Sequence, residues 1–236
     1  MSLLSPFTKK SKLSATIKQT EVARKSDGNT RDGLFKAAYQ SYAEILQDDA
    51  LRADALYHWG FALFNQASTK PPEVAAGLFQ DAIEKFSFCM LINPNYLAAA
   101  INSGVAYMDL ARLNHAKADD HLYLLAKNQF EKANAIQAGT ASYNLGCIYG
   151  LQGNMDKCLA ELEIARIKVT LPTINDILND PDMSTVKYHD WFKTFIESLK
   201  NDIIEAKEKA EAEVEAKILA NEQKKIKKVS NDAHYY

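Results

Sequence analysis

One segment of the chain, NHAKADDHLY, gathers side chains that could bind a metal ion. His115, Asp119, Asp120 and His121 lie close together in it. In a helix His115 and Asp119 would share a face while His121 would lie well off it, so at most three ligands could converge. Zinc normally requires four ligands, three of them from protein at an open site. We therefore predict a solvated turn here and no metal site.

The other candidate sites are weaker still. The stretch NDILNDPDMS lacks the central glycine and the terminal glutamate of a calcium loop, so we predict turn and cap residues there. No catalytic or phosphate-binding motif is present, and we predict no enzymatic activity and no cofactor. A basic terminus precedes Tyr235 and Tyr236, and it either keeps the chain soluble or touches phosphate or an acidic protein. Its lysines are Lys224, Lys225, Lys227 and Lys228.

Composition narrows the class of protein. The 236 residues include 28 basic and 30 acidic ones, for a net charge of -2, so no global positive field indicates a nucleic-acid partner. Cys89, Cys147 and Cys158 are widely spaced and form neither a disulfide framework nor a zinc signature, which favours a reducing compartment. No secretory signal and no run of about 18 apolar residues is found. These features predict a cytoplasmic protein without a membrane span.

A repeat organises the chain. Gly60, Gly104 and Gly146 each lie inside a helical pattern, at spacings of 44 and 42 residues. After each glycine comes a second helical pattern whose small, large and small residues share one face. A half-unit without a glycine precedes them. The face residues are Ala38, Tyr42 and Ile45; Ala82, Phe86 and Cys89; Ala126, Phe130 and Ala133; and Cys158, Leu162 and Ala165.

Two of the repeats are lengthened. Gly60 lies 22 residues before Ala82, as Gly104 does before Ala126, but only 12 residues separate Gly146 from its equivalent, so two units carry the same ten extra residues. Glycine costs a helix interior about 1 kcal/mol relative to alanine. We therefore predict that each glycine lies where the first helix of a pair meets the second and a side chain would push them apart.

These units resemble tetratricopeptide repeats, whose helix pairs follow a period of about 34 residues. The best matches are ASYNLGCIYGLQGNMDKCLAELEIARIKV and ADALYHWGFAL with DAIEKFSFCMLINPN. The lengthened repeats and the Trp-Gly pair are also similar to the plant mitochondrial outer-membrane import receptor family, which ends in a membrane anchor. Because this chain ends in EQKKIKKVSNDAHYY, we carry over only the architecture of that family.

The resemblance implies an all-α fold, a right-handed superhelical solenoid of antiparallel helix pairs. We expect a disordered tail over 1–13 and a repeat domain over 14–199, followed by a charged Ala/Glu/Lys helix and basic tail over 200–236. This last helix is either solvated or a pairing or docking helix. Within the repeat domain we expect a half repeat at 14–50, repeats near 53–94, 97–138 and 139–170, and a capping segment at 171–199 that ends in an amphipathic helix.

In this family the first helix of each pair lines a concave groove, which places three residues per repeat there. The row of His58, Asn102 and Asn144 could hold the backbone of an extended peptide, with apolar flanks for its side chains. Tyr57 and Phe61 stand where the clamp for chaperone carboxylates needs lysine and asparagine, which disfavours that partner. Alternatively, these residues face the insertions, the N-terminal segment or neighbouring helices. The groove candidates are Tyr57, His58 and Phe61; Ile101, Asn102 and Val105; and Tyr143, Asn144 and Cys147.

The leading hypothesis is a non-enzymatic adaptor or scaffold that binds a hydrophobic or amphipathic segment of a protein partner in this groove. The alternative is an assembly subunit that docks into a larger complex, or self-associates, through its lengthened turns and C-terminal helix. A metal protein or enzyme based on the His115 to His121 cluster is the third hypothesis, and we expect metal analysis to find none.

Overall fold

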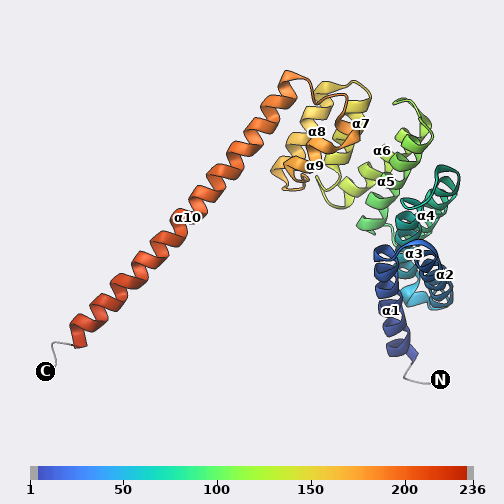
Figure 1. The fold of residues 1–236 in the computed structure, drawn as a ribbon, viewed down its shortest axis with the longest axis horizontal. Helices are drawn as coiled ribbons and strands as arrows, with labels where there is room; N and C mark the ends of the chain where they lie inside the picture. Colours follow the sequence, from blue (N-terminus) through green and yellow to red (C-terminus); the bar gives the residue numbers. More distant parts are fainter. Residues whose placement is uncertain (1–4, 233–236) are drawn as a thin grey trace. The chain divides into compact units, whose positions relative to one another are not determined.

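Helix pairs follow one another along the first part of the chain (Figure 1). The computed structural model describes residues 5–232, and no strand occurs among them. The chain divides after Leu171 into two units. The first unit is an α-solenoid, as predicted. Its pairs are α1 (Ser5–Lys25) with α2 (Gly28–Ile45), α3 (Arg52–Ala67) with α4 (Pro72–Ile92), α5 (Leu97–Leu113) with α6 (His121–Ile136), and α7 (Ser142–Leu151) with α8 (Met155–Ile167).

The two insertions take different forms. The first lengthens the helices themselves, since α3 and α4 have 16 and 21 residues where α7 and α8 have 10 and 13. Part of the second forms a turn between α5 and α6. There His115 has a φ of 51°, and the Asp120 carboxylate accepts a hydrogen bond from the Leu122 amide as an N-cap. The helix α6 therefore begins only at His121.

The core confirms the predicted face of the second helices. All twelve residues of the small, large and small pattern are at most 2% exposed. The large members are Tyr42, Phe86, Phe130 and Leu162. One face of each second helix is thus buried against the first helix of its pair. This burial is the main source of stability in such a solenoid.

The glycines lie where the two helices of a pair approach most closely. A Cβ placed on Gly60 would come 2.8 Å from the Phe86 ring, and one on Gly104 would come 2.5 Å from the Phe130 ring. At Gly146 the partner is the smaller Leu162, and the distance is 3.4 Å. The predicted reason for the glycines is confirmed at the first two positions, and the third is less crowded.

The first helix begins earlier than expected. It starts at Ser5 rather than near Ser14, and it pairs with α2. Leu13 is buried in the core cluster that includes Phe35 and Tyr42, which explains why helix continues through the segment expected to be a tail. The half repeat is thus a complete helix pair, while residues 1–4 of the expected tail lie outside the described residues.

The second unit contains a short helix and an Asp-Pro turn, followed by the amphipathic helix expected at the end of the capping segment. They are α9 (Ile174–Asn179), η2 (Pro181–Met183) and α10 (Asp190–Asp232). Residues 201–215 of α10 are exposed all round. The expected basic tail cannot be compared, because Tyr235 and Tyr236 and the side chains of its lysines lie outside the described part. No helix within the described residues is both long and apolar enough to cross a bilayer.

Candidate protein-binding groove

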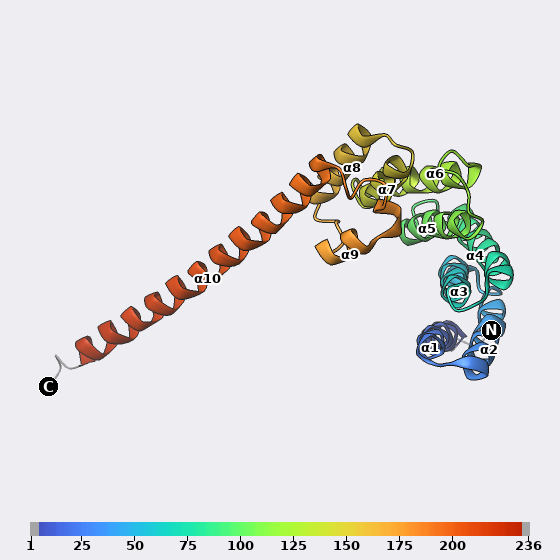
Figure 2. The same ribbon diagram turned by 45° about the horizontal axis from the view of Figure 1, so that its top comes forward.

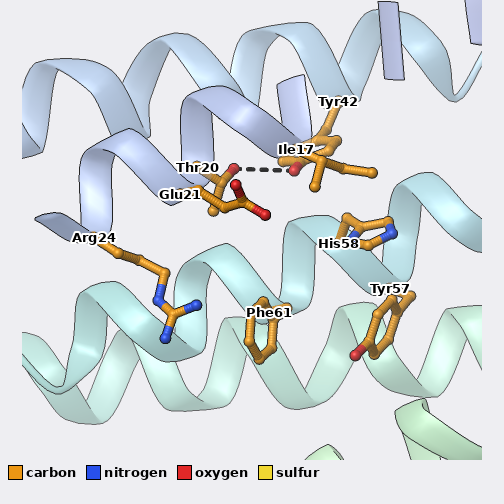
Figure 3. Close-up of a pocket in the computed structure, with 8 residues that line it drawn as sticks. All are labelled: Ile17, Thr20, Glu21, Arg24, Tyr42, Tyr57, His58 and Phe61. Atoms are coloured by element: carbon orange, nitrogen blue, oxygen red, sulfur yellow. Dashed lines mark hydrogen bonds between the residues drawn. The ribbon is translucent and has the colours of Figure 1, made fainter. Parts of the chain in front are cut away.

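A small pocket opens between the first helices of the first two pairs. In Figure 2 the helices α1, α3 and α5 lie on the inner side of the arc that the pairs form, with α2, α4 and α6 outside. The pocket has a volume of about 140 Å³. Figure 3 shows its lining, which comes from α1 (Ile17, Thr20, Glu21, Arg24), α2 (Tyr42) and α3 (Tyr57, His58, Phe61).

Phe61 and Tyr57 form the aromatic wall of the pocket. Their ring centroids are 6.2 Å apart, and the Tyr57 ring also lies 4.9 Å from Tyr96. On the other side, the Arg24 guanidinium lies over the Phe61 ring, 5.4 Å from its centroid. Both aromatic residues are only half-buried. This wall therefore offers partly exposed aromatic surface to a ligand, with one cation beside it.

His58 contributes a polar but uncharged group. Burial lowers its pKa below the ordinary value of 6.5, against the opposing effect of the Asp54 carboxylate. Its ring meets that of Tyr57 edge-on at 4.9 Å. The imidazole is therefore neutral at neutral pH, and the lining contains one acidic and one basic residue, Glu21 and Arg24, both from α1.

The remaining groove candidates differ in accessibility. On α5, Ile101, Asn102 and Val105 are half-buried, and the Asn102 amide donates a hydrogen bond to the Tyr57 hydroxyl at 3.2 Å. Of the three candidates on α7, Asn144 is half-buried, whereas Tyr143 and Cys147 are only 8% and 2% exposed. The polar row of His58, Asn102 and Asn144 stays a prediction, and its apolar flank is accessible on α3 and α5 but closed on α7.

Sequence reasoning missed the contribution of α1. Ile17, Thr20, Glu21 and Arg24 line the pocket, yet none was a candidate. The available signal was the spacing of Leu13, Thr16, Thr20 and Ala23, which all lie on one buried face. Threonines at two of these positions concealed the pattern, because they do not register as apolar.

The described residues show no constellation typical of metal chemistry. No group of three or more His, Cys, Asp or Glu side chains among them could hold a metal ion. Cys89 and Cys158 are buried, and burial raises the pKa of each thiol to about 12. The groove can therefore offer apolar contact, ring stacking and hydrogen bonds, which are the means of holding a polypeptide segment.

A protein-family model matches the part of the chain that contains the lengthened helix pairs. Residues 29–147, which include both lengthened pairs and the α3 wall of the pocket, match the model of the plant-specific mitochondrial import receptor subunit TOM20. The chain belongs to this family. No curated protein matches the chain. TOM20 is an import receptor subunit and not an enzyme, which agrees with the prediction of a non-enzymatic, protein-binding helical repeat.

Membership in the TOM20 family corrects two expectations. The predicted cytoplasmic location is wrong, because the family is a mitochondrial import receptor subunit. Free cysteines indicate a reducing environment, and a balanced net charge carries no information on location, so neither feature could reveal this. The similarity also extends beyond the architecture to which the sequence analysis limited it, and the family is TOM20 rather than a general tetratricopeptide repeat family.

Proposed function

We propose that the chain is a receptor subunit that binds a segment of a mitochondrial precursor protein along the inner surface of α3 and α5. The observation that carries this proposal is the half-buried aromatic wall of Tyr57 and Phe61, which lies inside the region matched by the import receptor family. Aromatic side chains in partly desolvated pockets are the usual anchors of protein interfaces. The bound segment is hydrophobic or amphipathic, since apolar and aromatic groups dominate the wall.

Replacing Phe61 with glutamate tests this proposal. Arg24 lies beside the ring and can pair with the new carboxylate, so the fold should tolerate the change. We expect the affinity for a purified mitochondrial precursor protein to fall about tenfold or more, because an aromatic anchor contributes about 2 kcal/mol to binding. Fluorescence anisotropy with labelled precursor measures it.

Phe88 supplies the matched control. It is an aromatic residue of α4, 52% exposed and absent from the pocket lining, so Phe88→Glu makes the same change at another exposed site. Its affinity should equal that of the wild type. Equal affinities for Phe61→Glu and Phe88→Glu, in folded proteins, would exclude this groove as the binding site.

A second function is favoured by the exposed part of α10. Ile203, Ile204 and Val214 are 54 to 59% exposed on a helix segment that is itself exposed all round. These aliphatic side chains are the apolar surface that a docking partner of α10 would cover. In this alternative, the chain is an assembly subunit of a larger complex that docks through α10.

A further inference from the structure

Residues 9–25 of α1 bury fewer large apolar side chains than α3 does. The buried side chains in this part of α1 are Leu13, Thr16, Thr20 and Ala23, and Leu13 is the one large apolar residue among these four. In contrast, α3 buries both Leu56 and Leu63 and approaches Phe86 closely at Gly60. Because the free energy of burial grows with the apolar area removed from water, residues 9–25 of α1 gain less from packing than α3 does.

Polar contacts make up much of the attachment of α1. The buried hydroxyls of Thr20 and Tyr42 are hydrogen-bonded at 3.0 Å. Near its start, the Lys12 ammonium contacts the Glu44 carboxylate, and that of Lys9 lies 3.4 Å from Asp48. Ion pairs at this level of exposure are weak and screened by salt. A second helix of similar chemistry could therefore form the same contacts in place of α1.

The sequence of α1 has the composition of a mitochondrial targeting segment. Residues 5–20 of α1 contain four lysines, six serines or threonines and no acidic residue, and Glu21 is the one acidic residue of the helix. Targeting segments of this kind are amphipathic, basic, rich in serine and poor in acidic residues. The lysines of α1 reach acidic residues at the end of α2, while Leu13 enters the core. The helix α1, which lines the pocket, is thus similar in composition to the targeting helices of the proposed ligands.

The surface beneath α1 is complementary to such a helix. Phe35, Tyr42 and Ile45 form an apolar strip on α2, each at most 2% exposed while α1 covers it. Glu44 and Asp48 add negative charge where this strip ends. The strip continues into the pocket, because Tyr42 and Phe61 both line it (Figure 3).

From this arrangement we infer that α1 is an intramolecular occupant of the docking surface. A basic, acid-poor amphipathic helix of a precursor displaces α1, packs on Phe35, Tyr42 and Ile45, and reaches Phe61. The inference rests on the proposed function and adds a competitor to it. Binding therefore requires α1 to leave, and the intact chain binds its ligands more weakly than a chain whose α1 is released.

Release of α1 in the full-length chain tests the inference. The variant Leu13→Asp/Thr20→Asp places two charges on the buried face of α1. Its control, Ser11→Asp/Ser14→Asp, adds the same charges on the exposed face. The probe is a fluorescein-labelled peptide of residues 5–25 of this chain. We expect the released variant to bind it at least tenfold more tightly than the wild type and the control.

Two further measurements keep the test decisive. If the released variant does not fold, Lys9→Glu/Lys12→Glu weakens α1 through its exposed ion pairs, and we expect about threefold tighter binding of the peptide. A peptide with glutamate at positions 9, 10, 12 and 18 should not bind the released chain. Hydrogen exchange should show the amides of α1 exchanging faster in the wild type when the basic peptide is in excess.

The outcomes separate this inference from the proposed function. Equal peptide affinities in the wild type, the control and the released variant would overturn the displacement of α1, and so would the absence of binding to all three. The proposed function fails by a different result, a precursor affinity that does not respond to Phe61→Glu. If Phe61→Glu weakens precursor binding while the release of α1 leaves peptide affinity unchanged, the proposed function is supported and the displacement of α1 is excluded.

Discussion

At the scale of single residues, the contact between a glycine and a ring explains the repeat. Gly60 and Gly104 face the rings of Phe86 and Phe130, while Gly146 faces Leu162. The sequence predicted this contact because a glycine recurring in helical patterns needs a reason. It could not predict that the three positions differ in crowding, because that depends on the size of the residue opposite and on the exact helix separation.

The glycines therefore respond differently to alanine. Because the Phe130 ring is fully buried and cannot move aside, Gly104→Ala should lower the free energy of unfolding by about 1 to 3 kcal/mol through overpacking. Gly146→Ala meets ordinary contact distances and should be neutral or gain up to about 1 kcal/mol from helix propensity. Urea denaturation measures both. Equal destabilisation by the two would mean that crowding at the crossing is not what selects glycine.

At the scale of helices, the sequence predicted the pairs well and their ends less well. The positions of α3, α4, α5, α7 and α8 follow from apolar periodicity together with turn signals such as Pro71 and Pro72. The predicted helix starts were wrong where a cap or the burial of a single side chain, rather than apolar periodicity, determines the first residue of the helix. Asp120 caps α6 later than its pattern begins, and the burial of Leu13 extends α1 into the segment expected to be a tail.

The exposed part of α10 provides a prediction for this scale. Residues 201–215 are exposed all round, so removing residues 201–236 should change the melting temperature by little, as surface changes within about 0.5 kcal/mol do. Differential scanning calorimetry measures this. Light scattering on the full-length and the truncated chain tests the assembly alternative. That alternative predicts that truncation reduces the mass from an assembly to a smaller species, whereas the groove function predicts a monomer for both chains. A large drop in melting temperature would show that this segment packs on the rest of the chain.

At the scale of the whole molecule, the fold was accessible from the sequence but the location was not. Repeats specify a solenoid through their own packing, while the use of its groove depends on a few side chains. The residues on α3 were found because they have fixed spacings from Gly60. Those on α1 were missed, and the mitochondrial role became evident only through the family match.

The central claim is that a precursor segment lies against Phe61. A photoreactive phenylalanine derivative at position 61 keeps the aromatic ring and reports direct contact, and the same derivative at position 88 on α4 is the control. After irradiation with a mitochondrial precursor protein, we predict a cross-linked product from position 61 that excess unlabelled precursor removes, and none from position 88. A product from position 88 alone, or equal products from both, would contradict the assignment of the groove.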